Sequence, residues 1–191
     1  MLLRLLGPLV SRRLDAFERR FSYDATYMRE MWAASPRAFR AFAAIVRLSN
    51  HREETPLDAL YAAKLAGTLA EDCGPCAQLV VTMAERERVD LAVLRAIVAG
   101  DAAALDVASP DAALGLRFAR AVLARAPELE ALRAEVAKRW GQRALITLGL
   151  AIVSSRTYPV LKYALGHGHA CQSVRVGDAS LIPGLAAAGG A

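Results

Sequence analysis

The sequence predicts an all-α protein, a helical bundle of about seven to nine helices joined by short loops, and three observations support this fold class. Apolar residues recur every three or four positions along most of the 191-residue chain. A Ser or Thr followed by Pro, a typical helix start, occurs three times, at Ser35-Pro36, Thr55-Pro56 and Ser109-Pro110. Segments that alternate apolar and polar residues, as strands do, are almost missing.

The composition is that of one globular domain with a substantial core. Hydrophobic residues make up 55% of the chain and charged residues 23%, which excludes a disordered protein. The net charge of +5 comes from 24 basic and 19 acidic residues that are interleaved, so we predict no nucleic-acid partner. Three cysteines do not form a secreted disulfide framework, and a reducing cytoplasm fits them better.

Residues 1–34 are predicted to form an N-terminal amphipathic arm, with a helix over 11–30. The first ten residues look like a signal peptide only in part, because Arg4 breaks a short apolar run and no cleavage site follows. Residues 1–21 contain five arginines and two acids, a composition that suits contact with an anionic membrane surface. Packing of the arm across a subunit interface is the interpretation that we favour.

Residues 35–183 are predicted to form the helical domain. Its helices are expected at 36–46, 57–69, 73–88, 90–100, 110–123, 127–140 and 142–158. Serine, threonine or aspartate caps begin several of them, and Gly100 and Gly141 end two. The segment 142–158 is apolar on nearly all sides, so it should be a buried central helix that Pro159 interrupts. Residues 184–191 are expected to be a flexible tail.

The chemistry of the chain is concentrated at Cys73-Gly74-Pro75-Cys76. A Cys-x-x-Cys pair either cycles between dithiol and disulfide or supplies half of a zinc site. Pro75 fits the first turn of a helix because it lacks an N–H that would be unpaired there. The free N–H groups and dipole of that helix start stabilise a thiolate, so the pattern favours redox chemistry over structural or metal-binding cysteines.

A thioredoxin fold is not predicted, although thioredoxin contains the same Cys-Gly-Pro-Cys sequence, because here the motif follows a helix. A helix that leads into a Cys-x-x-Cys helix resembles the carboxymuconolactone decarboxylase family, and within it the AhpD-like alkylhydroperoxidases, over residues 57–100. The resemblance implies an all-helical subunit, a trimer or hexamer, and peroxide reduction through a disulfide. It also implies that Cys76 attacks the peroxide and that Cys73 resolves the product.

The family motif is Glu, eleven residues, Cys, two residues, Cys, three residues, His. Here the glutamate position falls on Tyr61 and the histidine position on Val80, so the proton relay of the family is missing. A thiolate that attacks a peroxide needs a base and an acid nearby. Glu71 is the best carboxylate, the Tyr61 phenol is a proton donor or a core residue, and the Gln78 amide is suited to orienting a substrate or water. Asp72 is expected to cap the helix and to raise a neighbouring thiol pKa.

A second group of polar residues follows the last predicted helix, with His167, His169 and Cys171 close together. These side chains form a metal site with the cysteine pair if the tail folds back, or they belong to a polar loop. A third hypothesis is that one of the histidines replaces the missing relay histidine in space. For the site as a whole we predict neither a metal nor a cofactor.

The predicted function is that of a thiol-dependent redox protein that reduces peroxides or exchanges disulfides. Its expected partners are other copies of the chain, a small peroxide or disulfide substrate, and a thiol reductant. Two alternatives stay open. One is a non-catalytic helical oligomer or binding module with inert cysteines. The other is a decarboxylase-type member, which rests on the family resemblance alone.

Overall fold

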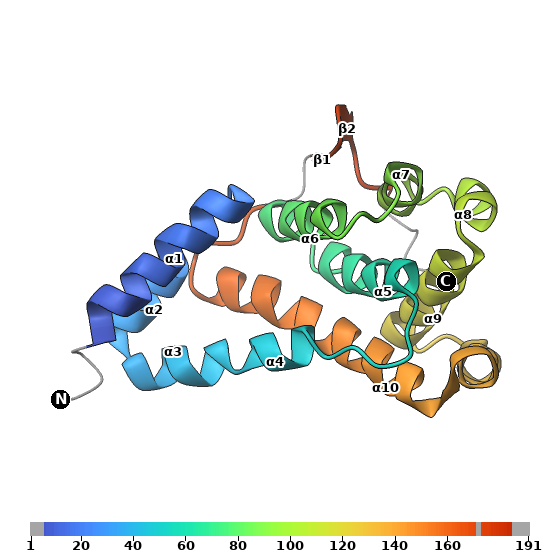
Figure 1. Cartoon of the computed structure of the whole chain (residues 1–191), viewed down its shortest axis with the longest axis horizontal. Helices are drawn as coiled ribbons and strands as arrows, with labels where there is room; N and C mark the ends of the chain where they lie inside the picture. Colours follow the sequence, from blue (N-terminus) through green and yellow to red (C-terminus); the bar gives the residue numbers. More distant parts are fainter. Residues whose placement is uncertain (1–5, 171–172, 185–191) are drawn as a thin grey trace.

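The computed structural model describes residues 6–170 and 173–184 and confirms the predicted all-helical class (Figure 1). The helices are α1 (Gly7–Phe21), α2 (Thr26–Ala34), α3 (Pro36–Ala43), α4 (Ile45–Ser49), α5 (Leu57–Leu69), α6 (Gly74–Arg86), α7 (Leu91–Ala99), α8 (Ala102–Ala108), α9 (Pro110–Ala124) and α10 (Leu129–Ala164). A short hairpin of β1 (Val174–Val176) and β2 (Ala179–Leu181) follows them.

The central helix is α5, which lies between α9 and α10 and against α6 (Figure 1). Its residues are small or apolar all round, as expected for a helix that contacts neighbours on every side. Two glycines bring the partners close. A Cβ at Gly115 of α9 would lie 2.7 Å from the carbonyl oxygen of Ala59, and one at Gly67 would lie 3.0 Å from the carbonyl oxygen of Ile152. The three helices are therefore packed at backbone contact distance.

Two groups of buried apolar residues hold the chain together. The larger, which we call the main core, joins residues of α5, α6, α7, α9 and α10. The smaller lies between the N-terminal helices and the end of α10, and we call it the aromatic cluster. Its buried members are Leu14, Tyr23, Ala25, Tyr27 and Phe42. The predicted N-terminal arm thus packs against the rest of the fold through side chains of its own.

The predicted helix end at Gly141 is confirmed, because this glycine has φ 86° and ψ 173° and separates α10 into two helical parts. Pro159 does not interrupt the second part, which continues to Ala164, so that prediction is wrong. Leu161 and Lys162 follow the proline and pack into the aromatic cluster, and this packing outweighs the lost backbone hydrogen bond.

The second part of α10 is not buried all round. Ile146 and Val153 are 58% and 59% exposed on its outer side, while the opposite side covers α5. By length and composition α10 is apolar enough to cross a membrane, and 44% of its most apolar window is buried inside the protein. Core helices of soluble proteins meet the same two criteria, so this observation is weak support for a membrane span.

Most of the predicted helix caps are confirmed. The side chains of Ser35, Asp90 and Ser109 accept hydrogen bonds from the backbone N–H groups of the helices that they begin. Thr55 does not cap α5. Its hydroxyl donates to the carbonyl oxygen of Glu53, and the N-cap position is taken by the next residue, a proline. The capping box predicted there is therefore wrong.

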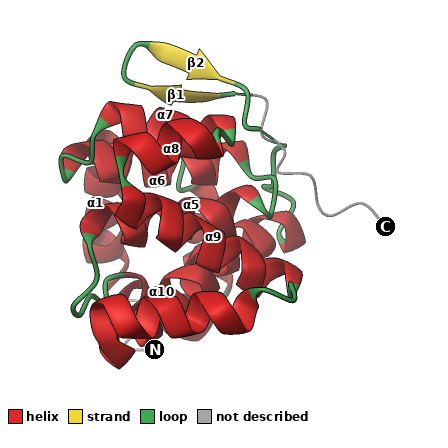
Figure 2. Cartoon of the chain, turned by 90° about the vertical axis from the view of Figure 1, so that its right-hand side faces the viewer, coloured by secondary structure: helices red, strands yellow, loops and turns green. Residues whose placement is uncertain are grey.

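The β-hairpin was not predicted from the sequence. Its strands have three residues each, too few for alternation to be recognised, and Gly177 takes a positive φ of 57° in the turn. Val174 and Val176 are buried, and the hairpin lies over α6 and α7 (Figure 2). The backbone after it is held by a hydrogen bond of 2.8 Å from Gly184 N to Val98 O. The remainder of the predicted flexible tail, 185–191, lies outside the described residues.

Candidate functional site

The two cysteines of the motif meet at the start of α6. Cys73 is the N-cap residue with extended backbone, and Pro75 lies in the first turn as predicted. Because Cys76 is three residues further on, it faces the same side of the helix as Cys73. The two sulfurs are 2.6 Å apart and belong to free thiols. Cys73 is 0% exposed and Cys76 4% exposed, so the pair is shielded from bulk water.

The two thiols have pKa values shifted in opposite directions. The hydrogen bond between the two sulfurs lowers the Cys73 pKa to about 7, with smaller contributions from the Cys76 N–H and the charge of Lys162, although burial opposes them. The Cys76 pKa is raised, chiefly by the same hydrogen bond and by burial. A pair this close titrates as one unit that releases its first proton easily and holds the second. The pair is therefore anionic in part at neutral pH.

A buried positive charge lies beside this anion. Lys162 of α10 is 3% exposed, and its Nζ lies 4.9 Å from the ring centre of Tyr23 and 5.3 Å from that of Tyr27. The Tyr23 hydroxyl is 4.0 Å from the sulfur of Cys76. The electron-rich faces of the rings compensate the buried ammonium, which in turn favours the thiolate over the thiol.

Sequence reasoning missed Lys162, Tyr23 and Tyr27. A signal for the lysine was present, because the chain has only three lysines among its 24 basic residues. Because the chain otherwise uses arginine, a lysine on an apolar helix is unusual. Neither tyrosine had a comparable signal, because their approach to the cysteines depends on how α1 and α2 fold over α6.

The segment after α10 folds back onto the cysteine helix. The N–H of Gly74 donates to the carbonyl oxygen of His169 over 3.1 Å, and the Tyr163 hydroxyl donates to the carbonyl oxygen of Asp72 over 2.8 Å. The imidazole of His167 contacts Glu30 of α2, with 2.7 Å between its Nε2 and a carboxylate oxygen. His167 is thus engaged with a carboxylate, and His169 contributes its backbone to the site.

The alternative of a metal site receives no support from the described residues. Within 6–170 and 173–184, no group of three or more His, Cys, Asp or Glu side chains is arranged to hold a metal ion. Cys171, which completed the hypothesis, lies outside the described residues. The tail nevertheless does approach the cysteine pair, as that hypothesis required.

Access to the pair is through a cavity of about 550 Å³ enclosed by α1 to α6 and α10. Cys76 lies on its wall, and so do Tyr23 and Tyr27. Tyr61 lies on the wall too, and its hydroxyl donates a hydrogen bond of 2.8 Å to Glu87 at the end of α6. Eleven residues separate Cys76 from Glu87, which places the two about 16 Å apart along the helix.

Of the residues predicted to transfer protons, Tyr61 lines the cavity, whereas Glu71 is bound to an arginine. Tyr61 and Val80 both line the cavity, so the two positions of the family motif do face it. Burial and the neighbouring Glu87 raise the Tyr61 pKa, and its phenol therefore stays protonated. Glu71 is bound to the guanidinium of Arg156, which occupies its carboxylate.

Gln78 contacts the hairpin, and Asp72 precedes the N-cap residue of α6. Gln78 lies two residues after Cys76, on the other side of α6, where its amide exchanges two hydrogen bonds with the backbone of Arg175. It therefore anchors the hairpin. Asp72 does not occupy the N-cap position of α6, because Cys73 is the N-cap residue.

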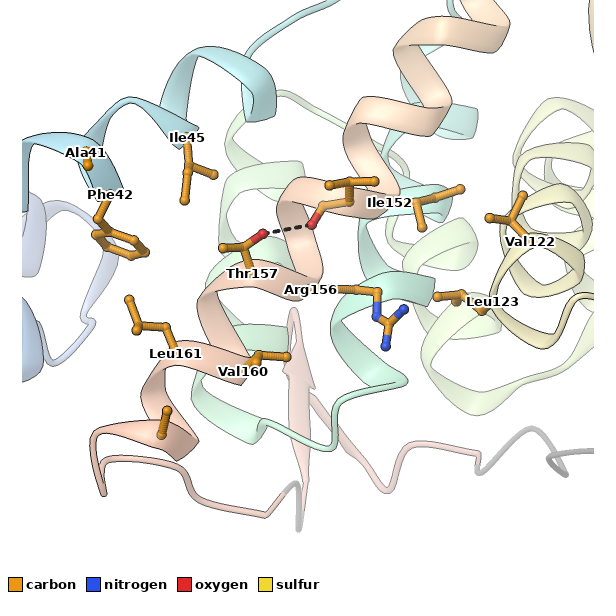
Figure 3. Close-up of a pocket in the computed structure, with 12 residues that line it drawn as sticks. Ala41, Phe42, Ile45, Val122, Leu123, Ile152, Arg156, Thr157, Val160 and Leu161 are labelled. Atoms are coloured by element: carbon orange, nitrogen blue, oxygen red, sulfur yellow. Dashed lines mark hydrogen bonds between the residues drawn. The ribbon is translucent and has the colours of Figure 1, made fainter. Parts of the chain in front are cut away.

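A second hollow, of about 760 Å³, lies on the outer side of α10, between α3 and α4 on one side and α9 on the other (Figure 3). Its walls are almost entirely apolar, and Arg156 is the one charged residue among those that line it. It contains no cysteine and no pair of titratable groups. The cavity at Cys76 is therefore the better candidate for chemistry.

Comparisons with known protein families, with curated proteins and with solved structures give no match to this chain. The resemblance to AhpD-like proteins thus stays a hypothesis based on the cysteine motif and its helical setting. What is established is an all-helical bundle in which a Cys-x-x-Cys pair lies at a helix start, with Cys76 on the wall of a cavity.

Proposed function

We propose that the protein is a thiol-dependent oxidoreductase that reduces peroxides or exchanges disulfides through Cys73 and Cys76. The observation that carries this proposal is the 2.6 Å separation of the two sulfurs, with Cys76 on the wall of a cavity. Sulfurs at this distance convert to a disulfide with only a small movement. Inert structural cysteines need neither a partner thiol nor an adjacent buried cation.

For a hydroperoxide, the first step is attack by the Cys76 sulfur on the terminal oxygen, after Cys76 has passed its proton to Cys73. A sulfur–oxygen bond forms, the oxygen–oxygen bond breaks, and the leaving alkoxide takes up a proton to become an alcohol. Tyr23 is suited to supply this proton, since its hydroxyl lies 4.0 Å from the sulfur and stays protonated at neutral pH because burial raises its pKa. Lys162 stabilises the attacking thiolate.

The second step closes the disulfide. The sulfur of Cys73 attacks the sulfur of the Cys76 sulfenic acid, and water leaves with the proton of the Cys73 thiol. One hydroperoxide and two thiols thus become one alcohol, one water and one disulfide. An external thiol reductant returns the two electrons and protons. With a disulfide substrate, the same thiolate attacks sulfur in place of oxygen, and a substrate thiol leaves.

The test uses a Cys171→Ser chain, so that the thiols counted belong to the pair alone. We expect one equivalent of cumene hydroperoxide to remove both thiols and to lower the protein mass by two hydrogens. With Cys73→Ser added, Cys76 should stop at a sulfenic acid that dimedone traps, and with Cys76→Ser added neither product should form. Two thiols that persist under excess peroxide, in a chain with unchanged circular dichroism, would rule out the peroxidase form of the proposal.

Disulfide exchange is tested separately, by mixing the reduced Cys171→Ser chain with oxidised glutathione and measuring the redox potential of the pair. We expect an intramolecular disulfide to form without accumulation of the mixed disulfide, because the second sulfur is already in contact. The family resemblance also implies self-association, as a trimer or hexamer. Sedimentation of the same samples tests this prediction.

A further inference from the structure

The cavity beside Cys76 has walls suited to a large apolar molecule. Its volume of about 550 Å³ lies in the usual range of small-molecule sites, and it is more enclosed than the hollow on the outer side of α10. Aromatic and aliphatic side chains make up most of its lining, among them Leu14, Phe17, Phe39, Leu79 and Met83. A peroxide as small as hydrogen peroxide would contact few of them.

The charged residues of the same lining are strongly biased in sign. Four cations line the cavity, Arg13, Arg20, Lys64 and Arg86, against one carboxylate, that of Glu87. Among the described residues, none of the four cations has a carboxylate oxygen within 4 Å, although Arg86 donates a hydrogen bond to the carbonyl oxygen of Arg20. Arg13, Arg20 and Arg86 are exposed residues and Lys64 is half-buried, so the lining has an excess of positive charge that attracts an anion.

The single carboxylate offsets this excess only in part. Glu87 accepts the hydrogen bond of Tyr61, and it lies 3.7 Å from the guanidinium of Arg52, which is outside the cavity lining. Its negative charge is therefore shared with a cation that does not line the cavity. Arg20 and Arg86 both lie over the ring of Phe21, at 5.2 and 5.5 Å from its centre.

Lys64 gives the strongest support for an anion-binding site among the four cations. It projects from α5, is half-buried, and has its Nζ 5.1 Å from the ring centre of Tyr61. Burial lowers its pKa although the negative charge of Glu87 opposes the shift, so the compensation of its ammonium is incomplete. A ligand carboxylate beside Lys64 would supply that compensation, and it would also keep the lysine protonated.

We propose that this cavity binds an anionic amphiphile, a molecule with one carboxylate at Lys64 and a long apolar body that extends toward Cys76. The span available is up to about 16 Å, the rise of α6 between Cys76 and Glu87. Binding of such a molecule follows from the cavity alone. The further step, that a hydroperoxide of this amphiphile is the substrate, rests on the proposed redox function. In that case the apolar body places the peroxide group at the Cys76 sulfur.

Binding is tested in the full chain with all three cysteines changed to serine, which removes redox chemistry from the measurement. Fluorescent cis-parinarate is titrated first, and palmitate, methyl palmitate and hexadecyltrimethylammonium then compete for it. We expect palmitate to displace the probe at a concentration at least tenfold lower than its neutral ester, and the cation not to compete.

Lys64→Met should weaken palmitate binding about tenfold, which corresponds to ~1.4 kcal/mol, and leave the ester unchanged. Lys64→Arg keeps the charge and should preserve binding. Lys138→Met is the matched control, since Lys138 is exposed on the first part of α10, away from the cavity lining, and it should change nothing. Equal affinities for palmitate and its methyl ester would overturn the proposal. So would a Lys64→Met variant that keeps its palmitate affinity and has the same unfolding transition as the parent chain.

The two proposals fail in different ways. Palmitate binding by the serine chain, together with thiols that peroxide does not oxidise in the Cys171→Ser chain, would refute the redox function and keep the amphiphile site. Disulfide formation with peroxide, together with no displacement of cis-parinarate by palmitate, would refute the amphiphile site and keep the redox function.

Discussion

The main core and the aromatic cluster are built on opposite principles. In the main core, alanine, leucine and glycine bring α5, α9 and α10 to backbone contact, and the described side chains leave little space between them. In the aromatic cluster, tyrosine and phenylalanine rings lie beside a cavity, a buried lysine and a thiol pair. The main core therefore stabilises the fold, whereas the aromatic cluster contains groups that lower its stability.

The cost in the aromatic cluster is visible in its polar atoms. The Tyr27 hydroxyl is buried and has no hydrogen-bond partner among the residues described. The ammonium of Lys162 is buried with ring faces as neighbours, and two thiols share one site. A buried polar group without a full set of partners destabilises a protein by about 1–3 kcal/mol. Groups of this kind are expected where a function requires them.

The largest effect should come from the main core. Gly115→Ala places a methyl group 2.7 Å from the Ala59 carbonyl oxygen and 2.8 Å from its Cα, so α9 must move away from α5. We expect a loss of about 2 kcal/mol in the free energy of unfolding, measured by urea denaturation. The matched control is Gly149→Ala, where nothing lies within 4 Å and the better helix propensity of alanine should stabilise by about 0.5–1 kcal/mol. Equal effects of the two variants would show that the packing is looser than described.

A smaller effect is expected from the charge in the aromatic cluster. Lys162→Met removes the cation that favours the thiolate, so the pKa of the pair should rise. We expect alkylation by iodoacetamide at pH 7 to slow about tenfold, with fold stability kept or increased because methionine needs no compensation for burial. Lys162→Arg retains the charge and should retain the rate. A slower rate with an unchanged pH profile would assign Lys162 a packing role instead.

The smallest effect should come from Tyr23→Phe. Its hydroxyl is 4.0 Å from the Cys76 sulfur, at the outer limit of a hydrogen bond to sulfur, so its contribution is modest. We expect peroxide-dependent disulfide formation to slow about threefold, or ~0.7 kcal/mol, while alkylation changes less. Alkylation slowed as much as the peroxide reaction would show that Tyr23 acts on the thiolate and not on the leaving oxygen.

The parts of this structure that the sequence predicts are those determined locally. The caps at Ser35 and Ser109, the helix end at Gly141 and the cysteine pair at the start of α6 each depend on residues within one turn. Pro159 shows the limit of local signals, because packing of the following turn keeps α10 helical.

The contents of the site could not be predicted in the same way. The contact of Glu71 with Arg156 joins residues 85 positions apart, and that of Tyr163 with the backbone of Asp72 joins residues 91 apart. Lys162 reaches the cysteines only because α10 passes beneath α6 and the N-terminal helices close over both. Pairings of this kind follow from the tertiary fold, and neither periodicity nor motif spacing contains them.

The reactivity of the thiol pair as a function of pH tests the central claim most directly. In the Cys171→Ser chain, the rate of alkylation should rise with the fraction of thiolate and reach half its maximum near pH 7, since the pKa of Cys73 is lowered to about 7. With Cys73→Ser added, the rise should move to higher pH, because Cys76 then loses its partner and remains buried. A rate that rises only toward pH 9, the ordinary value for a thiol, with or without Cys73, would contradict the account.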